Sequence, residues 1–184
     1  MTLPDLAGAA ASLGIGNPIN TGLPTFAGDV PAESEDPAEH AAMMIGQGKV
    51  LTSPLTMATL MGTISHGGTI HPNLIEGTFT EPEPEPRPAP ALTGQEADQL
   101  QSMLRSVVTD GHLQLLLDVP GGPVMGKTGT AEFGSESPLR THSWVIAAQD
   151  DLAVAVFVED GDYGSVTGGP MMREFLLQAS HISH

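Results

Sequence analysis

The sequence predicts an α+β fold in which a small antiparallel sheet packs against helices. Three runs in the last third of the chain, PVMGKTGTAEF, RTHSWVIAA and LAVAVFVED, are rich in β-branched and apolar residues. The polar segment QDD between the last two runs is typical of a hairpin loop. Stretches before and after these strands carry apolar residues at helical spacing. Hairpin-linked strands that are flanked by helices define an α+β unit.

Size and composition narrow the function classes. The 184 residues suffice for one domain with a hydrophobic core. Six basic and 22 acidic residues give a net charge of −16, which repels phosphate backbones, so nucleic acid is not expected as a partner. The chain has no cysteine, and its histidines are not accompanied in sequence by the further ligand residues that a metal site needs. We therefore expect no metal and no cofactor. No targeting or membrane segment is expected either.

Residues 1–79 are expected to form a mostly helical segment. The start of the chain is rich in small residues and reads as irregular, and the acidic patch DVPAESEDPAEHAAMM leads into a short helix around 37–45. The clearest helix follows Ser53, which can cap it, with Pro54 in the first turn and glycines at its end. Its apolar side chains recur at i, i+3, i+4 and i+7: Met57, Leu60, Met61 and Ile64.

The second half is divided from the first by a connector. Residues 80–92 are Pro-rich, and the run TEPEPEPRPAP favours an extended polyproline II conformation. Residues 93–184 are expected to contain a helix, the three antiparallel strands and a C-terminal helix. The first of these helices begins with the capping box Thr93-x-x-Glu96. The last is predicted from GGPMMREFLLQAS, with Pro170 in its first turn.

One lysine satisfies two unrelated signatures. Gly121, Gly126, Lys127 and Thr128 match the P-loop pattern G-x-x-x-x-G-K-T, while Lys127 also opens the K-T-G element of penicillin-recognising serine enzymes. A P-loop needs a helix directly after its Lys-Thr to bind phosphate, and the following TAEFGSESP contains breakers of such a helix. Pro123 also removes an amide donor from the loop. Nucleotide binding is therefore the poorer interpretation.

The K-T-G interpretation fits the predicted strand. A strand places Lys127 and Thr128 on opposite sides, Gly129 permits a close approach of a ligand backbone, and Thr130 offers a hydroxyl and an amide. An extended peptide could add to this strand while an ammonium and hydroxyl groups bind its terminal carboxylate. His142 on the next strand has no evident catalytic partner, so a packing role is expected.

Five segments together carry a resemblance to a known family. These are IGQGKVLTSPLTMATLMGTISHGGTIHPNLI, MLRSVVTDG, GKTGTAEF, HSWVIAA and LAVAVFVEDG. In order and spacing they are similar to the transpeptidase domain of penicillin-binding proteins, most of all its monofunctional, class B members, from about Leu13 to Leu177. The resemblance implies a five-stranded antiparallel sheet flanked by helices, beside a helical subdomain, with the active site between them.

The resemblance also implies a function and site residues. It implies a D,D-transpeptidase that binds peptidoglycan stem peptides or β-lactams at the outer face of the cell membrane, with cell-wall synthesis proteins as candidate partners. Lys127 would help to anchor the ligand carboxylate and take part in proton relay, and Thr128 and Thr130 would hydrogen-bond that carboxylate. The amide of Thr130 would donate in the oxyanion hole. The candidate catalytic residues are thus Lys127 and Thr130, and the candidate substrate-binding residues are Lys127, Thr128, Gly129 and Thr130.

Two elements of the family pattern are absent from the sequence. The nucleophile of the family lies in S-x-x-K, but the only lysines here, Lys49 and Lys127, do not follow a serine at that spacing, and no S-x-N occurs. We therefore expect the C-terminal part of a transpeptidase domain, with the N-terminal part of the same domain as its partner, that does not acylate by itself. The alternative is a non-catalytic relic or interaction module that binds peptide, β-lactam or a protein partner.

Overall fold

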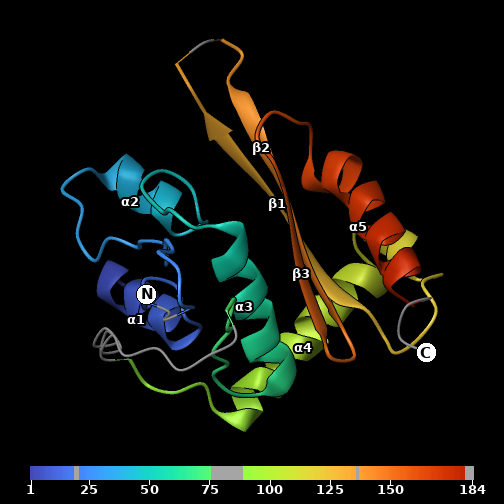
Figure 1. Cartoon of the computed structure of the whole chain (residues 1–184). Coiled ribbons are helices and arrows are strands. Elements are labelled where there is room, and N and C mark those ends of the chain that lie inside the picture. Colours follow the sequence, from blue (N-terminus) through green and yellow to red (C-terminus); the bar gives the residue numbers. More distant parts are fainter. Residues whose placement is uncertain (19–20, 76–88, 136, 181–184) are drawn as a thin grey trace. The chain divides into compact units, whose positions relative to one another are not determined.

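The chain forms two compact units, which are described separately. The computed structural model describes residues 1–18, 21–75, 89–135 and 137–180 (Figure 1). The units are Met1–Gly94 and Gln95–His184. The elements in chain order are α1 (Leu3–Ser12), α2 (Pro37–Met43), α3 (Pro54–His66), α4 (Gly94–Thr109), the 3₁₀ helix η1 (Gln114–Leu116), β1 (Met125–Phe133), β2 (Arg140–Gln149), β3 (Leu152–Val158) and α5 (Gly164–Ser180). Most of the predicted connector at 80–92 lies outside the described residues.

Helix α3 confirms the strongest helix prediction. The Ser53 side chain accepts a hydrogen bond from the Thr56 amide at 3.2 Å, and Pro54 occupies the first turn. The helix ends at Gly67, whose φ of 75° lies in the left-handed region that favours glycine. Met61 and Ile64 are buried. Capping and burial therefore act together to define this helix.

The expectation of an irregular start is wrong, because residues Leu3–Ser12 form helix α1. Thr2 and Asp5 form a capping box: the Asp5 amide donates to Thr2 Oγ1, and the Thr2 amide donates to Asp5 Oδ2 at 2.8 Å. The helix sequence LPDLAGAAAS is rich in alanine. Alanine favours helix but adds little apolar periodicity, so a search for a hydrophobic stripe misses such a helix.

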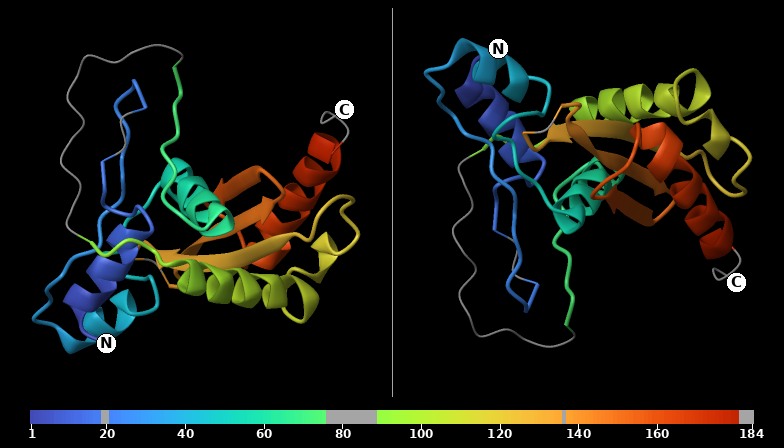
Figure 2. Two further views of the ribbon diagram at one scale, coloured as in Figure 1. Left: turned by 90° about the horizontal axis from the view of Figure 1, so that it is seen from below. Right: turned by 90° about the horizontal axis from the view of Figure 1, so that it is seen from above.

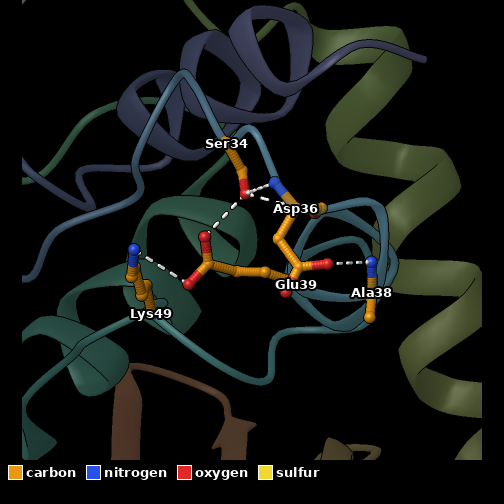
Figure 3. A network of polar contacts seen from close by, with 5 residues as sticks. All are labelled: Ser34, Asp36, Ala38, Glu39 and Lys49. Atoms are coloured by element: carbon orange, nitrogen blue, oxygen red, sulfur yellow. Dashed lines mark hydrogen bonds and ion pairs between the residues drawn. The ribbon is translucent and has the colours of Figure 1, made fainter.

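The acidic patch is organised around the start of α2, which confirms the short helix expected there (Figure 3). Asp36 caps the helix by accepting from the Ala38 amide at 2.8 Å. The Glu39 carboxylate accepts from Ser34 Oγ at 2.6 Å and lies 2.9 Å from Lys49 Nζ. The hydrogen bond from Ser34 and, to a smaller extent, the contact with Lys49 hold the pKa of Glu39 below its ordinary value. Lys49, one of the two lysines of the chain, therefore belongs to this surface network.

The second unit contains the predicted three-stranded antiparallel sheet, in the order β1-β2-β3. The register pairs Thr128 with Val145 and Val145 with Val156. Because side chains alternate along a strand, these residues share one face of the sheet, and Lys127 with its partner Ile146 shares the other. This arrangement confirms the α+β class.

One face of the sheet is covered within the second unit by α5 and by the end of α4 (Figures 1 and 2). Val145 and Met172 are fully buried there, as is Val108 of α4. Met103, an apolar residue one turn before Val107 in α4, is 61% exposed. The buried residues of this core are Val108, Leu113, Leu116, Val119, Val124, Val145, Ala147, Met172 and Leu176.

Helix α5 begins earlier than predicted. It starts at Gly164, so Pro170 lies inside the helix and not in its first turn. The amides of Val166 and Thr167 both donate to the Tyr163 carbonyl, which turns the chain into the helix. The segment GSVTGG consists of weak helix formers, so local propensity gave no signal for this start. Packing of this segment on the sheet therefore determines where α5 begins.

An ion pair ties α5 to the segment after η1. The Arg173 guanidinium donates to both carboxylate oxygens of Asp118, at 3.0 Å and 2.5 Å. These hydrogen bonds hold the pKa of Asp118 below its ordinary value and raise that of Arg173. A bidentate contact of this kind fixes the relative orientation of its two elements.

The ion pair predicts a pH dependence of stability. Because the pKa of Asp118 is lower in the folded than in the unfolded chain, the pair stabilises the fold above the unfolded pKa of about 4. Its contribution is lost as the pH falls through the folded pKa. Thermal melts are expected to show a lower Tm for Asp118→Asn at pH 7, with wild type and variant converging in acid. Asp151→Asn, at an exposed turn, is the matched control, and an unchanged Asp118→Asn difference down to pH 3 would contradict the prediction.

Candidate functional site

The K-T-G sequence lies in the middle of strand β1. Lys127 is exposed, and its Nζ donates to the Thr128 carbonyl at 2.6 Å. Thr128 and Thr130 are half-buried and project from the opposite face of the strand. The strand continues to Phe133, so no helix follows the Lys-Thr pair as a P-loop requires.

The glycine loop before β1 is hydrogen-bonded to residues at the β2–β3 turn. The Gly122 amide donates to Asp150 Oδ2 at 3.1 Å. The Gln149 side-chain amide donates to the carbonyls of Pro120 and Gly122, each at 2.9 Å. A carboxylate thus binds an amide that a phosphate-binding loop would offer to its ligand. The rejection of the P-loop interpretation is consistent with this geometry.

The backbone of β1 presents alternate groups at its outer edge. The Thr128 carbonyl accepts from Lys127 Nζ, which indicates that this peptide group points away from β2. In an antiparallel ladder the same orientation recurs at every second residue. The amide of Thr130 therefore lies at the same edge, where an extended ligand could approach.

A pocket of about 250 Å³ lies beside the two threonines, within the second unit. Its walls come from β1, from the turn after α4 and from the start of α5. Lys127 does not line it. The lining residues are His112, Thr128, Thr130, Tyr163, Gly164 and Ser165.

Gly164 holds the start of α5 against the K-T-G strand. Its amide donates to Thr130 Oγ1 at 3.2 Å. A Cβ at Gly164 would lie 2.4 Å from the Trp144 carbonyl oxygen and 2.7 Å from that of Gly129, closer than real side chains come. Only glycine allows this contact without a shift of the backbone. The position of Thr130 in the pocket thus depends on a residue 34 positions away.

The structure separates the four predicted site residues. It brings Thr128 and Thr130 together at the pocket and places Lys127 and Gly129 on the other face of the strand. At Gly129 an added Cβ would be 3.3 Å from Trp144 Cβ, so cross-strand packing gives a reason for a glycine here. The sequence had suggested ligand approach as the reason.

Four pocket residues were not predicted: His112, Tyr163, Gly164 and Ser165. Tyr163 and Ser165 flank Gly164, and the late predicted start of α5 hid their place beside the threonines. His112 follows the glycine that ends α4, where sequence shows a helix end but not what it faces. No local pattern links these residues to β1.

His142 has the packing role expected for it. Its ring stacks on Phe133 with centroids 3.9 Å apart, and its Nδ1 lies 2.6 Å from the Glu159 carbonyl oxygen. It lies on the face of the sheet opposite the pocket, since it pairs with Ala131. Across the described residues, no three His, Cys, Asp or Glu side chains gather as metal ligands, and no helix is long and apolar enough to cross a membrane.

Comparison with known proteins shows the family. Residues 1–177 match the model of the penicillin binding protein transpeptidase domain, and the chain belongs to this family. The match confirms the resemblance seen in the sequence and extends it to the start of the chain. The peptidoglycan D,D-transpeptidase PbpA of Mycobacterium tuberculosis is 35% identical over an alignment of 151 residues, and the match covers 74% of this chain and 30% of that protein. The chain therefore spans about 30% of the length of this curated relative.

Solved structures agree with the family assignment. Penicillin-binding protein A from M. tuberculosis, as its penicillin G acyl-enzyme complex, is 27% identical with a TM-score of 0.71, and the match covers 95% of this chain and 42% of that one. A chain of a peptidoglycan synthase complex that coordinates polymerization and crosslinking is 26% identical with a TM-score of 0.76, over 96% of this chain and 32% of that one.

The contact at Gly164 predicts a large effect of one methyl group. Gly164→Ala is expected to lower the free energy of unfolding by about 1–3 kcal/mol, the usual cost of overpacking, because the new Cβ meets backbone and not a movable side chain. Denaturant titration measures the change. Gly94→Ala is the control, since its added methyl meets no atom within 4 Å. Equal stability of Gly164→Ala and wild type would show that α5 does not approach β1 this closely.

Proposed function

We propose that the second unit is the carboxylate-recognising part of a penicillin-binding D,D-transpeptidase. The observation that carries the proposal is the pair of hydroxyl groups, Thr128 and Thr130, that line one pocket beside β1, the edge strand of the described sheet. The ligand is a peptidoglycan stem peptide ending in D-Ala-D-Ala, or a β-lactam that mimics it. Membership of the transpeptidase family supports this choice of ligand.

The charge of the pocket suits a carboxylate. The chain has 22 acidic residues, yet none of the described residues that line the pocket is acidic. Hydroxyl donors that meet an ionised acceptor form short, strong hydrogen bonds. The stem peptide would lie extended along β1, and its terminal carboxylate would enter the pocket between the threonines and α5.

The reaction proposed for the whole protein is acyl transfer through a serine. The serine Oγ forms a bond to the carbonyl carbon of the penultimate D-Ala, the C–N bond to the terminal D-Ala breaks, and the serine proton goes to the leaving amine. The amide of Thr130, at the edge of β1, would donate to the developing oxyanion. Lys127 would support the carboxylate by its positive charge, while its ammonium takes part in the proton relay.

The nucleophile is proposed to lie outside these 184 residues. Neither S-x-x-K nor S-x-N occurs in the sequence, although both belong to the family pattern. We propose that these residues form the C-terminal part of a transpeptidase domain and acylate only together with its N-terminal part. The site would act at the outer face of the cell membrane. The relative in a peptidoglycan synthase complex makes cell-wall synthesis proteins the proposed protein partners.

Substitution of the two threonines tests the recognition step. Thr130→Val and Thr128→Val keep the shape of the side chain but remove the donor. Each is expected to weaken binding of a diacetyl-Lys-D-Ala-D-Ala peptide by about tenfold, the effect of one hydrogen bond to a charged group. Isothermal titration calorimetry measures the dissociation constants. Thr69→Val, at an exposed position of the first unit, is the control.

Two outcomes would count against the proposal. Unchanged affinity in both threonine variants would remove the pocket as the carboxylate site. Labelled penicillin tests the acyl-transfer step: a longer product of the same locus that contains S-x-x-K is expected to be labelled covalently, and these 184 residues alone are not. Failure of the longer product to label, with peptide binding retained, would favour the non-catalytic module.

A further inference from the structure

The pocket has a third polar wall that the threonines do not supply. It is formed by His112, in the turn between α4 and η1. His112 is exposed, whereas its neighbour Leu113 is fully buried in the core of the second unit. The histidine therefore projects from an anchored segment and not from a loose loop.

The end of α4 fixes the backbone on both sides of this histidine. The Leu113 amide donates to the Val107 carbonyl at 3.2 Å, a bond that closes the last turn of the helix. A Cβ at Gly111 would lie 2.7 Å from the same carbonyl oxygen, so a glycine is required there. With Gly111 and Leu113 both fixed, the backbone of His112 has little freedom, and the residue lines the pocket.

We propose that His112 is a further substrate-binding residue, which donates a hydrogen bond to the terminal carboxylate of the ligand from the side opposite β1. The inference rests on the proposed function, because it names a second wall of the same carboxylate site. An imidazole carries at least one N–H donor in its neutral and in its protonated form. Thr128, Thr130 and His112 would then surround the carboxylate with donors from two separate elements.

The remaining walls of the pocket favour the same kind of ligand group. Tyr163 and Ser165 contribute hydroxyl groups, and Tyr163 is 72% exposed, so it stands at the open side. The pocket also meets the first turn of α5, a helix of 17 residues whose N-terminus bears a partial positive charge. Each wall therefore offers donors or positive potential to an anion.

The experiment separates the carboxylate from the rest of the ligand. The full 184-residue chain, labelled with ¹⁵N, is titrated with diacetyl-Lys-D-Ala-D-Ala bearing a free C-terminal carboxylate, and with the same peptide as its C-terminal amide. Dissociation constants are read from shifts of the amide signals. His112→Ala is expected to weaken binding of the acid about tenfold and to leave the weak binding of the amide unchanged. His112→Gln, which keeps an N–H donor, is expected to recover part of the affinity.

The control is His71→Ala, which removes an exposed histidine of the first unit and is expected to bind the acid as wild type does. Acid binding by His112→Ala at wild-type affinity would overturn the role of His112 and leave the proposed function standing. Equal weakening of acid and amide would place His112 against another part of the ligand and also overturn it. If the wild-type chain does not prefer the acid over the amide, both the carboxylate site and His112 as part of it are wrong.

Discussion

The close packing of Gly164 against β1 and β2 is the constraint on which the site depends. It brings the backbone of the first residue of α5 next to the carbonyl groups of Gly129 and Trp144, where no side chain fits. From there the Gly164 amide reaches the Thr130 hydroxyl. The same contact places Tyr163 and Ser165 beside the threonines. A residue without a side chain thus determines the geometry of a pocket made of side chains.

The two faces of β1 divide the side chains of the K-T-G element into two groups. Thr128 and Thr130 face the pocket, and their hydroxyls suit a carboxylate. Lys127 projects from the other face, and its Nζ donates a hydrogen bond to the Thr128 carbonyl at the outer edge of β1. Alternation along a strand makes this division unavoidable, since adjacent side chains point to opposite faces. In the proposed function, the motif would therefore bind the carboxylate on one side and supply positive charge on the other.

Much of the fold could be predicted because the signals were local. Ser53, Pro54 and Gly67 mark the ends of α3 by capping chemistry that acts within a few residues. The strands were evident from their β-branched runs. The start of α5 was not, because Gly164 begins a helix in a segment of weak helix formers and is held by strands more than 15 residues away in sequence. Long-range packing overrides propensity there.

The site could be predicted only in part for the same reason. The K-T-G pattern identified the strand and its threonines, because that pattern is contiguous. His112 lines the pocket from the turn after α4. The sequence of this turn predicts the end of a helix but does not indicate which residues lie near it in space. Resemblance to the family implied roles for residues within the motif, and the tertiary structure showed the other residues that line the same pocket.

The central claim is that the threonine face of β1 binds the terminal carboxylate. A crystal structure of the chain with the D-Ala-D-Ala peptide tests it directly. We predict carboxylate oxygens within about 3 Å of the Thr128 and Thr130 hydroxyls, a normal hydrogen-bond distance. A carboxylate bound on the face of Lys127, with the pocket unoccupied, would contradict the account.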